Sequence, residues 1–179
     1  GLGLASPAPA ASLWSYLAAG TALLSMMGLA DDLRPLSPLA KFAVQLLAVA
    51  GMLWPLQVLP AESLAGHWLL LLPAVILWVN IWNFMDGSHG LIAVQALLIA
   101  LAVCLLPGQT PALRLAALAL AGACLGFLPF NLPEARLFLG DVGSHALAAA
   151  VIGLLLASVH YRTLSLPEAL MLSSVLLVD

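Results

Sequence analysis

The sequence predicts an all-α fold, a polytopic bundle of about six to seven membrane-spanning helices. Composition is the first reason, because the 179 residues are 64% hydrophobic and only 7% charged, whereas a soluble domain carries about 25% charged residues. Spacing is the second, since apolar segments long enough to cross a bilayer alternate with clusters of proline and glycine. The net charge of −3 and the absence of a basic run indicate no nucleic-acid partner and leave the lipid bilayer as the surroundings.

Each predicted span is bounded by residues that end helices. The breaks contain Pro35–Pro38, Pro107–Gly108 and Pro129–Pro133. We expect a single transmembrane domain over residues 1–179, truncated at both ends, because the chain opens without methionine and stops inside an apolar run. The opening residues carry no positive charge ahead of an apolar core, so they do not form a signal peptide. The predicted spans cover roughly residues 12–30, 38–57, 67–84, 89–106, 112–130, 145–161 and 167 to the end.

The order of the spans gathers the acidic residues on one side of the membrane. Each span carries the chain across, so alternate connections share a side. The acidic side then holds Asp31, Asp32, Asp86, Glu134 and Asp141, joined by Asp179 if the last span completes. Only Glu62 and Glu168 fall on the other side.

The two sides also differ in their aromatic and basic residues. The side opposite the acids has aromatic side chains near its helix ends, as in an interfacial belt: Trp14, Tyr16, Trp54, Trp68 and Tyr161. Three basic residues on the acidic side (Arg34, Lys41 and Arg136) outnumber the two opposite (Arg114 and Arg162). This small excess favours a cytoplasmic acidic face.

The first acidic motif runs from Gly28 to Pro38 and contains the adjacent pair Asp31 and Asp32. Two neighbouring carboxylates repel each other unless a cation lies between them or water surrounds them. The alternative to a functional pair is therefore a solvated loop. Lys41, at the next helix end, either serves the site or extends toward the lipid headgroups, and Gln45 is suited to a hydrogen bond between helices.

The second motif places Asn80, Asn83 and Asp86 at intervals of three, so the three polar side chains share one helix face. Polar groups along a spanning helix are costly in lipid and often functional. The alternative is a hydrogen-bonded seam between helices that ends in a turn at Asp86-Gly87.

The third motif runs from Phe130 to Ser144 and contains Gly140-Asp141-Val-Gly143-Ser144. Either Asp141 or Ser144 could simply cap the following helix. However, the two glycines let backbone approach a ligand closely, and the N-terminus of that helix offers N–H groups to a phosphate. Taken together, three acidic loops on one face predict a site for a hard cation such as Mg²⁺ bound to a phosphate group at the membrane surface.

These three motifs resemble the polyprenyl-phosphate N-acetylhexosamine-1-phosphate transferases, glycosyltransferase family 4, which includes phospho-N-acetylmuramoyl-pentapeptide transferase. The resemblance lies in the order and content of the motifs from Gly28 to Ser144, including Leu36-Ser37-Pro38, Asn131 and Ala135-Arg136. It implies a multi-pass enzyme of the bacterial inner membrane with a cytoplasmic active site. Such enzymes transfer an N-acetylhexosamine-1-phosphate from a UDP-sugar to undecaprenyl phosphate and release UMP. The short gap after Asp32 and the string Asn83-Phe-Met-Asp86-Gly87-Ser are most similar to the O-antigen-initiating branch.

The resemblance also implies roles for individual residues. It implies a Mg²⁺ cofactor, with Mn²⁺ as an alternative, held by Asp141 and Asp86, and it leaves a homodimer open. The implied catalytic residues are Asp31, Asp32, Asp86 and Asp141. The implied substrate-binding residues are Lys41, Asn80, Asn83, Gly87, His89, Asn131, Gly140, Gly143 and Ser144. Of the acidic pair, one carboxylate would act as general base on the lipid phosphate or hold the metal, and a double displacement through an aspartate stays open.

The sequence departs from the family pattern at two histidines. His89 stands where most members have an aspartate, so it would serve as a neutral ligand or a phosphate donor. His145 stands where a hydrophobic residue is commoner, and packing in the bundle explains it. The Arg- and His-rich cytoplasmic loop of the family would follow the last predicted helix, and we expect this stretch of chain to be inactive without it.

Three other classes fit less well. An intramembrane aspartic protease would need glycine where Phe138 stands, and a CDP-alcohol phosphotransferase would need Ala-Arg soon after Asp86-Gly87. A cation transporter would place its acids at mid-membrane rather than at loop edges. Mg²⁺ flux into liposomes without substrate would identify a transporter.

Overall fold

The structure, a computed structural model, describes residues 10–56 and 66–173, and within these it contains helices and no strand. The all-α fold predicted from composition and spacing is therefore confirmed. The elements in chain order are α1 (Ala10–Leu33), α2 (Pro38–Leu53), η2 (His67–Leu71), α4 (Leu72–Met85), α5 (Leu91–Leu105), α6 (Pro111–Asn131), α7 (Gly140–His160) and α8 (Leu166–Ser173). The π-helical turn η2 runs directly into α4.

Four segments are long and apolar enough to cross a membrane: Leu13–Leu33, Trp68–Met85, Pro111–Asn131 and Gly140–His160. Helices α2 and α5 are apolar but shorter, with 16 and 15 residues. A helix rises about 1.5 Å per residue, so these two extend only about 24 Å and fall short of a full bilayer core. The chain is a multi-pass membrane protein.

Several helices begin at a local signal. The hydroxyl of Ser37 accepts a hydrogen bond from the N–H of Ala40 at 3.3 Å, and Pro38 occupies the first turn of α2. Thr110 does the same for α6 through the N–H of Leu113 at 3.2 Å, with Pro111 following. A hydroxyl cap followed by proline is a favourable start, because proline needs no N–H partner there.

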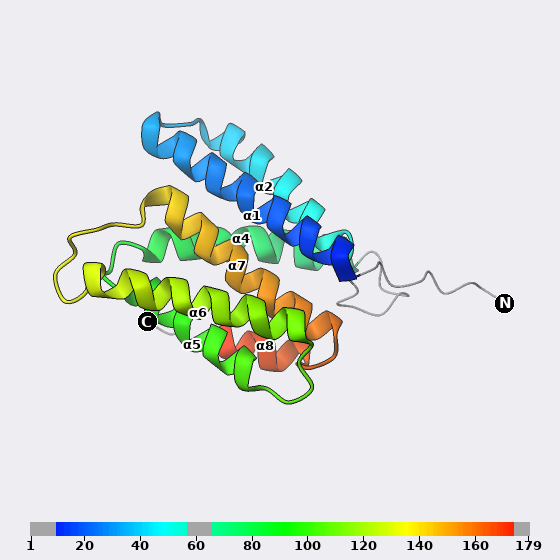
Figure 1. The fold of residues 1–179 in the computed structure, drawn as a ribbon. Helices are drawn as coiled ribbons and strands as arrows, with labels where there is room; N and C mark the ends of the chain where they lie inside the picture. The colour runs from blue at the N-terminus through cyan, green and yellow to red at the C-terminus, as the bar shows by residue number, and fades with distance from the viewer. Residues whose placement is uncertain (1–9, 57–65, 174–179) are drawn as a thin grey trace.

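Helix α7 forms the centre of the bundle. In its apolar window 67% of residues are buried, against 22–33% in the other three spans. Figure 1 shows α7 between the α1–α2 pair on one side and α5, α6 and α8 on the other. Helix α4 also packs on α7, where the indole N–H of Trp78 donates to the carbonyl of Ala148 at 3.3 Å. Residues on α7 are therefore held by several neighbouring helices.

The loops alternate between the two ends of the bundle, as the sequence predicts. The loops ahead of α2, α5 and α7 lie at the left in Figure 1, and those ahead of α6 and α8 lie at the right. We call the first end the acidic face, because it carries Asp31, Asp32, Asp86, Glu134 and Asp141. The two further acids placed by the sequence argument, Glu62 and Asp179, lie outside the described residues.

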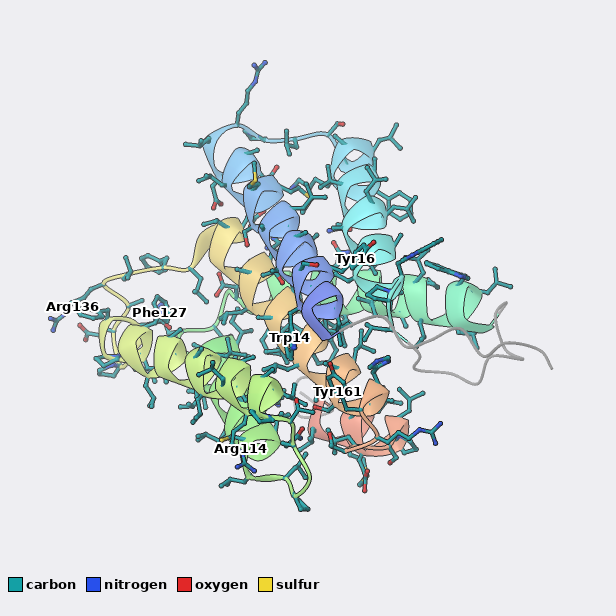
Figure 2. All side chains as sticks on the ribbon, turned by 45° about the vertical axis from the view of Figure 1, so that its right-hand side comes forward. Trp14, Tyr16, Arg114, Phe127, Arg136 and Tyr161 are labelled. Carbon is teal, nitrogen blue, oxygen red and sulfur yellow. The ribbon has the colours of Figure 1, made fainter. Side chains whose placement is uncertain are left out.

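The opposite end carries the expected aromatic residues. Trp54 and Trp68 lie with ring centroids 6.2 Å apart, and Tyr161 meets His160 edge-on at 5.1 Å. Figure 2 shows Trp14 and Tyr161 together at this end, where α1 begins and α7 ends. Arg114 and Arg136 mark the two ends of α6 in the same view. The arrangement agrees with an interfacial aromatic belt at one membrane surface.

Two predicted boundaries are wrong, one by five residues and one by four. The sequence places the sixth span at 145–161 and treats Gly140–Ser144 as a turn, whereas α7 begins at Gly140. The first turn is helical because a carboxylate from α1 binds its N–H groups, a contact no local pattern indicates. The second span also ends earlier than predicted, at Leu53 instead of residue 57.

Candidate active site

The two adjacent aspartates at the end of α1 have different partners. Asp31 forms an ion pair with Lys41 at the start of α2, and its other oxygen accepts the N–H of Leu36 at 2.7 Å. Asp31 therefore closes the α1–α2 turn. Lys41 is one-third exposed, so its ammonium group pairs with Asp31 and still reaches the surface.

Asp32 turns instead toward α7. Its two oxygens accept the N–H groups of Asp141 at 2.9 Å and Val142 at 3.0 Å. Those N–H groups were expected to be open to a substrate phosphate, but here a carboxylate of the protein occupies both. The approach is close because two glycines leave room: a Cβ on Gly28 would lie 2.2 Å from the Asp141 carbonyl oxygen, and one on Gly140 would lie 2.8 Å from Asp32.

Asp141 is also held through its side chain. The amide of Asn83 on α4 donates to the Asp141 carboxylate and to the hydroxyl of Ser144, both at 2.9 Å. The carbonyl of Asp141 lies 2.7 Å from Nδ1 of His145 and accepts from the Ser144 hydroxyl at 3.3 Å. Neither Asp141 nor Ser144 is the helix cap considered from the sequence, since both lie inside α7.

One turn further into the membrane, α4 and α2 are joined by an amide pair. Asn80 and Gln45 exchange hydrogen bonds at 3.0 and 3.2 Å. Asn80 also donates to the carbonyl of Ile76 at 2.7 Å, while Gln45 is buried. The polar face predicted for α4 is real, and its members differ: Asn80 joins helices, whereas Asn83 contacts the acidic residue of α7.

Asp86 ends the same face of α4, half-buried at the start of the α4–α5 turn. Its burial, together with the negative charges of Asp141 and Asp32, raises the pKa of Asp86 from 3.8 to about 6. Three carboxylates from α1, α4 and α7 thus lie close enough to repel one another. A cation placed among them would relieve that repulsion.

The other two loops of the acidic face are tied to each other by Asn131. Its side-chain oxygen accepts the N–H of Gly90 at 2.5 Å, and its NH₂ donates to the carbonyl of Leu137 at 2.9 Å. Gly90 has a left-handed φ of +74°, which favours glycine, and Leu132 packs against it. In this structure both ends of the buried Asn131 amide are used by backbone, so its evident role is to join the α4–α5 turn to the α6–α7 loop.

The remaining residues implied by the motifs are near this cluster without direct contacts to the acids. His89 is exposed and meets Phe138 edge-on at 5.9 Å, which adds a second link between the two loops. Gly87 is exposed in the turn, and Gly143 lies against the side chain of Leu139. Glu134 is exposed in the α6–α7 loop. Gly28 was not among the predicted site residues, although its place one turn before Asp32 on the same face of α1 was the available signal.

The donor set fits a metal that is shared with a substrate. Among the described residues, no group of three or more His, Cys, Asp or Glu side chains could by itself hold a metal ion. Mg²⁺ is usually bound by one or two carboxylates together with water and substrate phosphates. Asp141 and Asp86 offer two carboxylates, and burial together with the charges of Asp141 and Asp32 raises the pKa of Asp86.

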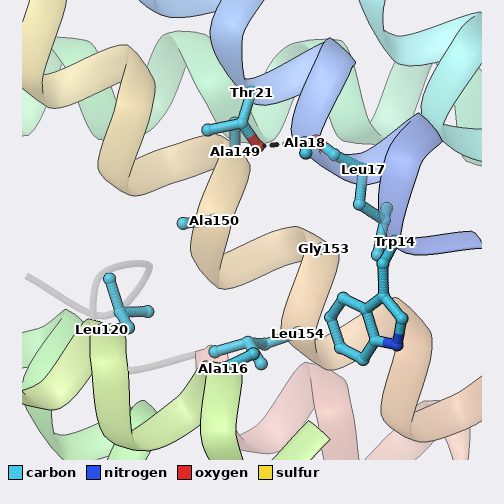
Figure 3. A pocket seen from close by; sticks show the side chains of 10 residues that line it. All are labelled: Trp14, Leu17, Ala18, Thr21, Ala116, Leu120, Ala149, Ala150, Gly153 and Leu154. Carbon is cyan, nitrogen blue, oxygen red and sulfur yellow. Dashed lines mark hydrogen bonds between the residues drawn. The ribbon is translucent and has the colours of Figure 1, made fainter. Parts of the chain in front are cut away.

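A second feature lies far from the acids. An apolar cavity of about 170 Å³ opens between α1, α6 and α7, with Trp14, Ala116 and Gly153 on its walls. Figure 3 shows the hydroxyl of Thr21 at its edge, already bonded to the carbonyl of Leu17 at 2.9 Å. No titratable side chain lines it, so it offers no side-chain acid or base to a reaction.

The chain is similar to known proteins of one family over most of its length. The model of glycosyl transferase family 4 matches residues 14–159, which include all the contacts above. The decaprenyl-phosphate N-acetylglucosaminephosphotransferase of Mycobacterium tuberculosis is 36% identical over 168 residues, covering 80% of this chain and 40% of that protein. The phospho-N-acetylmuramoyl-pentapeptide-transferase of Moorella thermoacetica is 39% identical over 173 residues, covering 83% of this chain and 53% of that protein. The chain thus spans about half, or less, of the length of these relatives.

Proposed function

The chain belongs to glycosyl transferase family 4, and on that premise we propose that it transfers a hexosamine-1-phosphate from a UDP-sugar to a polyprenyl phosphate, with UMP as the leaving group. The observation that carries the proposal is the meeting of Asp86, Asn83 and Asp141 at one membrane end of the bundle. These groups come from two helices and lie where a lipid phosphate and a soluble nucleotide sugar would meet.

The reaction joins two phosphates. An oxygen of the lipid phosphate attacks the phosphorus that bears the sugar, a new P–O bond forms, and the P–O bond to UMP breaks. Phosphoryl transfer depends mainly on positioning and on neutralisation of charge. We assign Asp141 and Asp86 to hold Mg²⁺, with Mn²⁺ as an alternative, and the metal when bound would neutralise charge on the pyrophosphate.

The protein residues supply the positioning. Asn83 fixes the direction of the Asp141 carboxylate through its 2.9 Å hydrogen bond. Lys41, at the α1–α2 turn with Asp31, would attract the lipid phosphate as it arrives from the bilayer. Asp31 would hold that ammonium group in place through their ion pair. His89, exposed in the α4–α5 turn, would donate to a phosphate oxygen of the nucleotide sugar.

For the substrates we propose undecaprenyl phosphate and a UDP-N-acetylhexosamine, with O-antigen or another cell-envelope polysaccharide as the pathway. The motif spacing supports the O-antigen branch, whereas the names of the relatives mention decaprenyl phosphate or N-acetylmuramoyl-pentapeptide. We place the acidic face in the cytoplasm, at the inner membrane of a bacterium, because the basic residues are more numerous there.

The test is a transfer assay in membranes with the complete parent protein that contains this chain. Undecaprenyl or decaprenyl phosphate, Mg²⁺ and one labelled UDP-N-acetylhexosamine at a time are added, and UMP release is followed with movement of label into the lipid fraction. We expect transfer that EDTA abolishes. Label that stays in the aqueous phase with every sugar and both lipids would refute the proposal. A trapped phospho-enzyme would identify the double displacement, and a single-step time course would identify direct attack.

A further inference from the structure

The two aspartates of the α1 motif are adjacent in sequence and distinct in structure. Successive residues of a helix point about 100° apart, so neighbouring carboxylates face different surroundings. Asp31 faces α2 and its lysine, and Asp32 faces the first turn of α7. Each carboxylate uses both oxygens for contacts within the protein.

Helix α7 has no cap from its own sequence. The residue before it, Leu139, has helical dihedral angles and no side chain that can accept a hydrogen bond. The first N–H groups of a helix need an acceptor and carry partial positive charge. Asp32, 109 residues away from Asp141 in sequence, supplies both the acceptor and the negative charge.

The contact is built into the packing of α1 on α7. Gly28 lies one turn before Asp32, and a side chain there would collide with the Asp141 backbone at 2.2 Å. Gly140 has φ +62°, and a Cβ there would press on the Asp32 carboxylate at 2.8 Å. Two positions without side chains, one on each helix, therefore permit the short distance that the cap requires.

The consequence concerns Asp141. Its N–H is held by Asp32 on α1, and its carboxylate is held by Asn83 on α4 at 2.9 Å. The direction of this carboxylate is thus set from two other helices. Loss of either support would let the first turn of α7 fray and the carboxylate move, and displacements of about 1 Å are enough to reduce catalysis about a hundredfold.

We propose that Asp32 is a positioning residue that acts through Asp141: it caps α7 from α1 and so fixes the carboxylate of the site, and it neither accepts the proton of the lipid phosphate nor binds the metal. This inference rests on the proposed transfer reaction, and it separates the roles of two aspartates that the sequence treats as one pair. Asp31 instead pairs with Lys41 and joins α1 to α2.

The first experiment compares Asp32→Asn with Asp32→Ala, and uses the same changes at Asp31 as the matched control. Asparagine keeps one carbonyl acceptor, so it can form one of the two bonds to the N–H groups of Asp141 and Val142, but it cannot accept a proton from a phosphate. We expect Asp32→Asn to keep kcat within about tenfold of wild type and Asp32→Ala to lose about a hundredfold. The pH profile of kcat should stay unchanged in Asp32→Asn. An asparagine variant as inactive as the alanine variant would overturn the proposal.

The second experiment does not depend on activity. Amide hydrogen exchange of Asp141 and Val142 is measured by mass spectrometry in the detergent-solubilised protein. Asp32→Ala should speed exchange at these two N–H groups, whereas Asp31→Ala should not. Unchanged exchange in Asp32→Ala would refute the cap even if the enzyme were active. Absence of transfer by the wild-type protein would refute the proposed function instead, and the exchange result would still decide the cap.

Discussion

The first N–H groups of α7 and of α8 both need hydrogen-bond acceptors, and the two helices obtain them from different parts of the chain. At α8 the solution is local: the N–H and hydroxyl of Ser165 both donate to the Glu168 carboxylate at 2.7 Å, and the N–H of Glu168 approaches the Ser165 oxygen at 3.4 Å. At α7 the solution comes from another helix, through Asp32. A local cap stabilises a helix wherever it lies, whereas a cap from another helix also fixes where the helix lies.

The two caps differ because the two ends of the bundle carry different residues. The α8 cap lies at the end of the bundle that carries the aromatic residues, away from the predicted site residues. The α7 cap lies at the acidic face, where the first turn carries Asp141 and where α1 and α4 both bind that residue. At the proposed transfer site, contacts between separate helices hold the side chains in fixed positions.

The sharpest test compares the acids in the two first turns, Asp141 and Glu168. Asp141→Asn should reduce the rate of transfer by at least about a hundredfold, because a carboxylate that neutralises charge is lost. Glu168→Gln should keep the wild-type rate. UMP release in membranes measures both, and the amount of inserted protein is determined in parallel. A near-normal rate in Asp141→Asn would show that the metal assignment is wrong.

The next largest effect concerns the close approach of α1 and α7. Gly28→Ala places a Cβ against backbone, so we expect the free energy of unfolding to fall by about 1–3 kcal/mol. Gly122→Ala on α6 is the control, because its Cβ would meet nothing within 4 Å. That change should be neutral or stabilising by up to about 1 kcal/mol. Thermal unfolding in detergent compares the two, and equal midpoints would argue against tight α1–α7 packing.

A smaller effect is expected at the local cap. Ser165→Ala removes the hydroxyl that bonds Glu168, at a cost of about 1 kcal/mol. Because this cap touches no other helix of the site, transfer activity should not change. Thermal unfolding and the transfer assay together measure the two quantities. Loss of activity in Ser165→Ala would show that the N-terminus of α8 affects the acidic face at the N-terminus of α7.

The last comparison concerns a pH dependence of the metal-free protein. The folded-state pKa of Asp86, about 6, lies above its ordinary value of 3.8, so the folded state binds this proton more tightly than the unfolded state does. Stability should therefore fall as the pH rises from about 4 to about 6 and then level off. Unfolding midpoints in EDTA measure the fall, which Asp86→Asn should reduce. A rise in stability over that range in wild type, removed by Asp86→Asn, would contradict the raised pKa.

Local sequence patterns were enough to predict part of the fold. Hydrophobic runs and proline or glycine breaks predicted six spans and the start of a seventh. Helices lie at these places in the described residues, with α2 and α6 starting at Pro38 and Pro111, but only four segments are long enough to cross a membrane. The start of α7 was missed because Gly140 and its neighbours form a turn or a helix according to what binds their N–H groups. That partner, Asp32, is distant in sequence.

The candidate site also has a part that the sequence predicted and a part that it did not. Alternation of spans was enough to place Asp31, Asp86 and Asp141 on one face, because side is determined by counting crossings. Partners were not predictable: Lys41 pairs with Asp31, Asn80 pairs with Gln45, and the expected phosphate-binding N–H groups of α7 are bound to Asp32. Each pairing depends on how two helices rotate and slide against each other.

By itself, therefore, the sequence determined that this chain crosses a membrane several times and gathers its acidic motifs at one end, since hydrophobicity and crossing number depend only on residue order. Only the tertiary structure decided that Asp32 binds the first turn of α7 and that Asp31 pairs with Lys41 of α2. The reason is physical: two adjacent carboxylates are chemically alike, and they acquire different roles only from the N–H groups and charges that packing brings to each of them.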